Sequence, residues 1–164
     1  MDESNNNAEL SETKQVTDLQ MVVHAQYIKD LSFENPNAPE VLMEPPGQPD
    51  VEINVNVSAH SLGDSRFEVL LNLGAKARVE DKALFLIDLT YAGIVSCPGI
   101  AAKDVNPMVM IEVPRLLFPF ARAIVSDATR DGGFMPLNIQ PVDFVAVYQH
   151  NLAKQQETTS ETKQ

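Results

Sequence analysis

Hydrophobic and polar residues alternate along much of the first half of the chain, and this alternation predicts β-strands. In the clearest run, residues 51–58, aliphatic and polar positions strictly alternate. A period of two places one set of side chains in a core and the other in solvent. Residues 67–79 continue the pattern over an unusually long run, and residues 83–91 return as another apolar strand. An earlier run, residues 20–34, is also rich in residues that favour strands.

Two short polar stretches, 61–65 and 80–82, separate the last three strands and predict an antiparallel meander. The first strand is followed by residues 35–50, which contain five of the eleven prolines. Proline blocks strand pairing, so this segment is expected to be a long, extended and stiff loop. Its apolar trio, residues 41–43, needs a surface to lie against, and a loop of this length in a compact domain is usually functional.

The apolar spacing becomes helical after residues 97–99. Asn106 is expected to cap a helix with Pro107 at its first position, and Gly132-Gly133 is expected to end it. Pro114 and Pro119 are expected to break or kink its first half. The apolar stripe of this amphipathic helix comprises Leu117, Phe120, Ala121, Ile124, Val125 and Ala128.

After a proline-containing loop, Asp143 is expected to cap a second helix that runs to about Gln155. Four strands followed by two helices in separate blocks predict an α+β domain, with both helices on one face of the sheet. Residues 1–17 are polar and acidic and predict a disordered tail, and residues 154–164 predict a flexible one. The expected domain is therefore 18–153.

The negative charge of the chain is concentrated in its strand region. The formal net charge is −11, and residues 30–88 alone hold eleven acidic residues against four basic ones. Such a field repels phosphate backbones, so no nucleic-acid partner is expected. It favours a basic protein partner whose binding weakens with salt, although plain solubility explains the charge equally well at this point.

The remaining bulk features predict a cytoplasmic protein. Cys97 is the single cysteine, which suits a reducing compartment. No run approaches the roughly twenty apolar residues that span a bilayer, so no membrane insertion is expected. The acidic start, Met1-Asp2-Glu3-Ser4, lacks the basic and apolar regions of a signal peptide.

Enzyme and cofactor signatures are absent from the sequence. His24, His60 and His150 lie far apart and none has ligand spacing with Cys97, so no metal site or cofactor is expected. No GxSxG, HExxH, glycine-rich dinucleotide turn or GxxxxGK[ST] loop occurs. Two alternatives stay open: a small-ligand-binding or enzymatic α+β domain, and a structural assembly protein without client grooves.

Three stretches resemble motifs of the SecB family of protein-export chaperones. Residues 27–39 (YIKDLSFENPNAP) resemble its YxKDxSFExPNAP segment. Residues 117–122 (LFPFAR) resemble its LFPYAR motif, with Phe120 in place of tyrosine, and residues 134–144 (FMPLNIQPVDF) resemble its FPxLNLxPVNF segment. The resemblance covers about residues 20–152 and implies a four-stranded antiparallel sheet with two helices.

The resemblance also implies partners and site residues. The expected function is that of an ATP-independent holdase, not an enzyme, which keeps unfolded precursor proteins competent for export and delivers them to the SecA translocase ATPase. The expected assembly is a homotetramer, a dimer of dimers, with the helix stripe from Leu117 to Ala128 as its interface.

By motif match, the expected SecA-binding residues are Asp30, Glu34, Leu86 and Asp88. The expected client-binding residues are apolar side chains that adapt to many sequences: Phe33, Val41, Leu42, Met43, Phe144 and Tyr148. Each client residue also fits an ordinary core position, Phe144 most of all. The family often carries a tryptophan in the loop before its second strand, whereas this chain has no Trp, so the resemblance does not define client preference at that loop.

Overall fold

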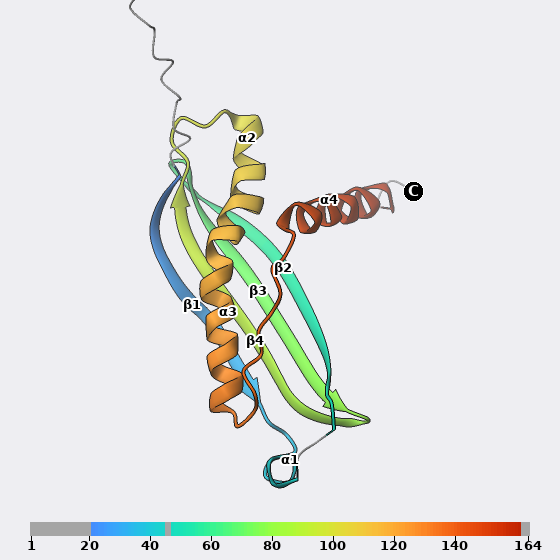
Figure 1. The fold of residues 1–164 in the computed structure, drawn as a ribbon. Coiled ribbons are helices and arrows are strands. Elements are labelled where there is room, and N and C mark those ends of the chain that lie inside the picture. Colours follow the sequence, from blue (N-terminus) through green and yellow to red (C-terminus); the bar gives the residue numbers. More distant parts are fainter. Residues whose placement is uncertain (1–20, 45–46, 162–164) are drawn as a thin grey trace, which may run out of the picture.

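The structure is a computed structural model that describes residues 21–44 and 47–161. The tail predicted over residues 1–17 lies outside the described residues. Four antiparallel strands form one sheet in the order β1-β4-β3-β2, as the sequence predicted (Figure 1). The strands are β1 (Val22–Glu34), β2 (Asp50–Gly63), β3 (Arg66–Val79) and β4 (Lys82–Ser96).

Tight turns connect the last three strands. Asp64 and Ser65, with φ of 51° and 56°, form the turn between β2 and β3. Two successive residues with positive φ are typical of the type I′ turn, whose twist matches that of the two strands in a hairpin. Strand β4 is longer than expected because it continues through Gly93 to Ser96. At Gly93 an added β-carbon would lie 3.0 Å from Leu117 Cδ2, so glycine permits the close packing of a helix on this strand.

One continuous helical segment follows the sheet. It consists of α2 (Ala102–Pro107), a π-helical stretch η1 (Met108–Glu112) and α3 (Val113–Asp131). The prediction that Asn106 caps the helix and Pro107 begins it was therefore wrong, since the helix begins at Ala102. Pro107 instead ends α2, where its missing N–H removes one hydrogen bond, and the helix widens in the next five residues.

The other two prolines do not break this helix. Pro114 directly follows the π-helical stretch η1, and α3 continues through Pro119 to Asp131. Leu117, Ala121 and Val125 are fully buried on α3, and their packing fixes this helix along one face of the sheet (Figure 1). Tertiary burial thus outweighs the local cost of proline.

The last helix, α4 (Phe144–Glu161), extends past the end expected near Gln155. Asp143 caps it as predicted, because its Oδ1 accepts hydrogen bonds from the backbone N–H groups of Val145 at 3.0 Å and Ala146 at 3.1 Å. Only its first residue, Phe144, is buried among its residues up to 157. Helix α4 projects past the β2 edge of the sheet, so α3 supplies most of the helical cover (Figure 1).

Candidate functional site

The loop between β1 and β2 contains a helical turn, α1 (Glu40–Met43), and is not extended throughout as expected. Backbone hydrogen bonds from Met43 N to Pro39 O, at 3.2 Å, and from Glu44 N to Glu40 O, at 3.3 Å, close this turn. Asn37 anchors the loop to the sheet by donating from its amide to Ala83 O at 2.8 Å. The sequence did not predict this turn, because its three apolar residues are too few to show a helical period among the prolines.

An apolar groove of about 570 Å³, the α1 groove, lies between α1 and the segment that follows α3. Two of its methionines are highly exposed, Met43 at 78% and Met135 at 89%. Leu42 packs close to Gly133, whose φ is 93° and where an added β-carbon would lie 3.1 Å from Leu42 Cδ2. The lining residues are Val41, Leu42, Met43, Gly47, Pro49, Val51, Leu84, Phe85, Gly133, Phe134, Met135, Pro136 and Leu137.

Three aromatic rings from distant parts of the chain meet beside this groove. Phe33 of β1 stacks on Phe85 of β4, with ring centroids 5.9 Å apart and planes at 20°. Phe85 also contacts Phe134, with centroids 5.1 Å apart. Aromatic rings pack favourably in such offset arrangements, so the cluster forms a firm wall for a groove whose other wall is a single helical turn.

A second groove, of about 750 Å³, lies on the β3–β4 side of α1. It shares Val41, Met43 and Leu84 with the α1 groove and adds Val79. Its rim is charged, and we call it the acid-rimmed groove. The charged residues are Glu40, Glu44, Glu80 and Lys82.

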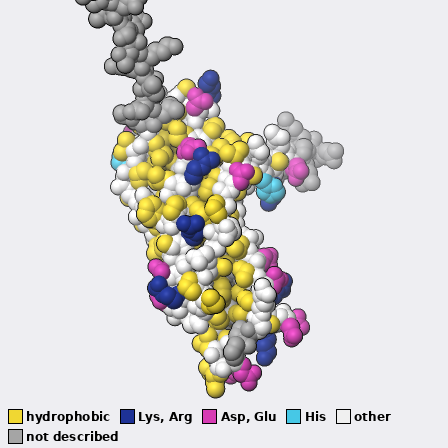
Figure 2. Space-filling model, in the orientation of Figure 1, with side chains coloured by type: hydrophobic (Ala, Val, Ile, Leu, Met, Phe, Trp, Pro, Cys, Tyr) yellow, Lys and Arg dark blue, Asp and Glu magenta, His cyan; other side chains and the backbone are white. Residues whose placement is uncertain are grey.

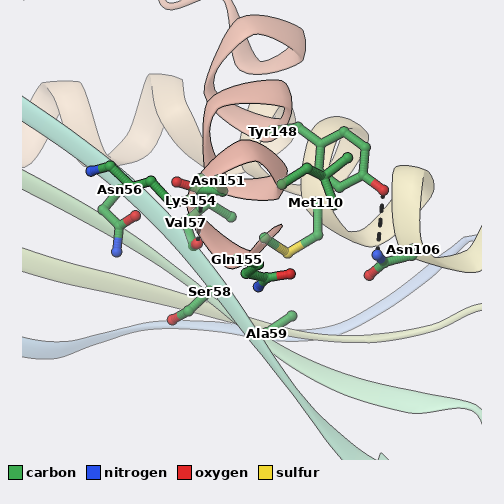
Figure 3. Close-up of a pocket in the computed structure, with 11 residues that line it drawn as sticks. Asn56, Val57, Ser58, Ala59, Asn106, Met110, Tyr148, Asn151, Lys154 and Gln155 are labelled. Carbon is green, nitrogen blue, oxygen red and sulfur yellow. Dashed lines mark hydrogen bonds between the residues drawn. The ribbon is translucent and has the colours of Figure 1, made fainter. Parts of the chain in front are cut away.

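The two expected client residues from the second helix lie elsewhere. Phe144 is buried and contacts Phe118 edge-on, with centroids 5.9 Å apart, so it belongs to the core. Tyr148 lines a separate, more polar cleft of about 410 Å³ between α4, η1 and β2 (Figure 3). There the Asn106 amide donates to Tyr148 Oη at 3.3 Å. The structure therefore brings together the expected residues of β1 and α1 and separates those of α4.

The sequence interpretation missed half of the α1 groove. Residues 133–137 and Phe85 come from segments far from α1 in the chain, and only the folded sheet brings them beside it. The sequence around Met135 could have indicated an exposed binding residue. This methionine stands next to a proline, in a segment between two helices, and does not belong to the apolar face of any strand or helix.

The four expected SecA-binding residues gather at one corner of the sheet face that α3 does not cover. Glu34 pairs with Leu86, and Ser32 of the same strand pairs with Asp88. Directly opposed residues share one face of a sheet, and Asp30 alternates with Ser32 and Glu34 on that face. We call Asp30, Glu34, Leu86 and Asp88 the acidic corner. It consists of three exposed carboxylates and one half-buried leucine, and Leu86 lies between Glu34 of β1 and Lys76 of β3.

The predicted interface stripe on α3 divides into buried and accessible positions. Leu117, Ala121 and Val125 are fully buried within this chain and have no surface left for a partner. Phe120 is 51% exposed and stacks on Tyr91 of β4, with ring centroids 6.5 Å apart. Hydrophobic side chains also gather along this face in Figure 2. We define the β1–α3 patch by the exposed apolar residues Ile28, Leu31, Leu116 and Phe120.

Within residues 21–44 and 47–161, no group of three or more His, Cys, Asp or Glu side chains is arranged to hold a metal ion. Cys97 is buried, and this burial raises the pKa of its thiol. His24 Nε2 hydrogen-bonds Ser96 Oγ at 2.9 Å on the sheet. In this same part of the chain, no helix has the length and apolar content to cross a bilayer.

The comparisons with known proteins point to one family. Residues 13–155 match the family model described as "Preprotein translocase subunit SecB". The chain is 52% identical to the protein-export protein SecB of Afipia carboxidovorans over 88% of this chain and 89% of that protein. It is 55% identical to that of Azorhizobium caulinodans over 79% of this chain and 81% of that protein.

A solved structure agrees in fold. The Mycobacterium tuberculosis Rv1957 SecB-like chaperone, in complex with a ChAD peptide from the Rv1956 HigA1 antitoxin, superposes with a TM-score of 0.57. The match covers 74% of this chain and 90% of that one at 16% identity. The resemblance in the three motifs is thus confirmed by matches along most of the chain. This protein belongs to the SecB family of protein-export chaperones.

Proposed function

We propose that this SecB-family chain holds unfolded precursor proteins in the cytoplasm, without ATP or an enzymatic step, and passes them to the SecA motor. Protein export is the role named for its relatives, which are about as long as this chain. The observation that carries the holding function is the α1 groove. It combines a firm aromatic wall with two exposed, flexible methionines.

The chemistry of the α1 groove suits many client sequences. Methionine side chains have three rotatable bonds and a polarisable sulfur, so they repack around side chains of different shapes. The groove presents few hydrogen-bonding side chains, and apolar contact does not depend on the order of residues in the client. Several such contacts along one unfolded chain give tight overall binding through effective concentration.

The acid-rimmed groove extends this preference. Glu40, Glu44 and Glu80 outnumber Lys82 around an apolar floor, so lysine or arginine beside an apolar client segment gains favourable charge pairing there. A client strand that crosses α1 would contact both grooves, which share Val41, Met43 and Leu84.

The acidic corner is our candidate for the SecA contact. Its carboxylates are exposed and set the association rate and salt dependence, while Leu86 supplies an apolar contact between them. The corner lies on the opposite face of the sheet from α3, so an occupied α1 groove does not cover it (Figure 1).

Self-association fits the β1–α3 patch. Strand β1 is an edge of the sheet, and Phe120 stands exposed on the adjacent helix. Burying apolar area against a second copy is favourable by about 25 cal/mol per Å². A homotetramer, a dimer of dimers, would cover this patch, and the sheet with the helices through Glu161 of α4 would form its folded subunit.

Suppression of aggregation of a chemically unfolded precursor protein, without nucleotide, tests the holding function. We expect the wild-type chain to suppress aggregation and Met135→Asp to suppress it weakly. Leu62→Asp is the matched control, because Leu62 is an exposed apolar residue at the far end of β2. Equal suppression by both variants would exclude the α1 groove, and no suppression by the wild type would exclude the holding function.

A further inference from the structure

An irregularity in β1 determines the direction of its acidic side chains. Ile28 pairs with Tyr91 of β4. The next ladder pair joins Asp30 to Thr90, so Lys29 is an extra residue in the strand. A one-residue change of register reverses the face of every following side chain. Without this bulge, Asp30 and the alternate residues after it would point toward the core face of the sheet.

Two side chains of β1 meet one carboxylate at this bulge. Glu68 Oε1 accepts a hydrogen bond from Lys29 Nζ, at 2.7 Å, and another from the Tyr27 hydroxyl. Both donors reach across β4, which lies between β1 and β3. Beneath them Ala92, the ladder partner of Tyr27, is fully buried. Only 14% of the Glu68 side chain is exposed, whereas 46% of the Lys29 side chain is, so the contact lies at the sheet surface with its carboxylate mostly covered by neighbouring side chains.

The protonation of Glu68 and Tyr27 agrees with this geometry. The hydrogen bonds from Lys29 and Tyr27 lower the pKa of Glu68. Donation to Glu68 raises the pKa of Tyr27 to about 12. The carboxylate is therefore anionic while the phenol keeps its proton, and hydrogen bonds to a charged acceptor are the stronger kind.

We propose that Glu68 is a positioning residue for the acidic corner: it holds Lys29 and Tyr27 across β4 and thereby fixes the bulge that turns Asp30 and Glu34 outward. Glu68 also pairs with the Lys29 ammonium, which would otherwise lower the negative potential around its neighbour Asp30. This inference rests on the proposed contact of SecA with the acidic corner.

The test measures SecA affinity at low salt, with amide hydrogen exchange over residues 28–34. Glu68→Gln keeps the size of the side chain but removes its charge, and we expect it to raise the Kd for SecA about tenfold. Exchange over residues 28–34 should become faster. Asp104→Asn, which removes an exposed charge from α2 on the helical side of the sheet, is the matched control and should change Kd by less than about twofold.

A double-mutant cycle separates positioning from general damage to the fold. If Glu68 acts through Asp30 and Glu34, then Glu68→Gln adds less than about twofold to Kd in a background that carries both Asp30→Asn and Glu34→Gln. The inference would be overturned if Glu68→Gln raised the Kd for SecA by the same factor in both backgrounds. It would also be overturned if Glu68→Gln alone bound SecA with wild-type affinity. If Asp30→Asn itself binds SecA normally, the proposed contact fails. Hydrogen exchange then decides the positioning role, which is refuted if Glu68→Gln leaves residues 28–34 unchanged.

Discussion

The end of α3 offers a quantitative test of the aromatic wall beside the α1 groove. At Gly132 an added β-carbon would lie 2.3 Å from Phe33 Cζ and 2.5 Å from its Cε1. Non-bonded carbons do not approach so closely, so Gly132→Ala must displace the Phe33 ring. That ring cannot swing away freely because it stacks on Phe85 at 5.9 Å.

Two opposing terms set the size of the effect. Gly132 has a φ of −75°, which alanine adopts easily, so the loss of chain freedom in the unfolded state stabilises the variant by about 0.4–1 kcal/mol. Overpacking costs about 1–3 kcal/mol. We therefore expect the free energy of unfolding to fall by about 1–2 kcal/mol. With a urea dependence of about 1–3 kcal/mol per molar, the midpoint shifts by roughly 0.3–2 M.

Urea titration at one fixed protomer concentration measures this shift. Gly47→Ala is the control, because its added carbon would lie 4.0 Å from Val79 Cγ1 and meets no other atom within that distance. Phe33→Leu should relieve part of the clash, so the double variant should be more stable than the two single effects predict. Strict additivity, or a Gly132→Ala variant as stable as the wild type, would refute the packing argument.

Three further predictions follow from other parts of the structure. Phe144→Ala should lower the free energy of unfolding by about 3–5 kcal/mol in the same titration, because Phe144 is a core residue. A loss below about 1 kcal/mol would contradict this core assignment and favour a client-binding role for Phe144. Asp30→Ala with Asp88→Ala should weaken SecA binding at low salt while light scattering shows an intact assembly, and unchanged affinity would exclude the acidic corner. Glu68 has a folded pKa below its usual value of 4.5, so its stabilising contribution is present above that pH and disappears as the pH falls through the folded pKa. Acid titration of stability should therefore be flatter for Glu68→Gln than for the wild type, and parallel curves would contradict the Glu68 contacts.

The periodic segments of this protein were readable from its sequence. Alternation over residues 51–58 and 67–79 predicted strands that the structure confirms as parts of β2 and β3. The N-cap at Asp143 was also predictable, because one carboxylate satisfies backbone donors two and three residues later. Motif recognition then gave the family. These features depend on residues close together in the chain.

Other features depended on contacts between distant residues. The continuation of the helix past Pro119 follows from burial of α3 on the sheet, which overrides local helix signals. The split of the α3 stripe into buried Leu117 and exposed Phe120 depends on which side of the helix meets β4. The period of the apolar residues shows which side chains share one face of a helix, but it does not show which element that face packs against.

The binding surfaces show the same division between local and tertiary information. The sequence identified the acidic and apolar residues, but only the sheet pairs Glu34 with Leu86 and stacks Phe33 on Phe85. The outward direction of Asp30 depends on one extra residue in β1, and its proposed support comes from Glu68 two strands away. A pattern of period two determines which side chains share a face, whereas long-range pairing and burial decide what that face meets.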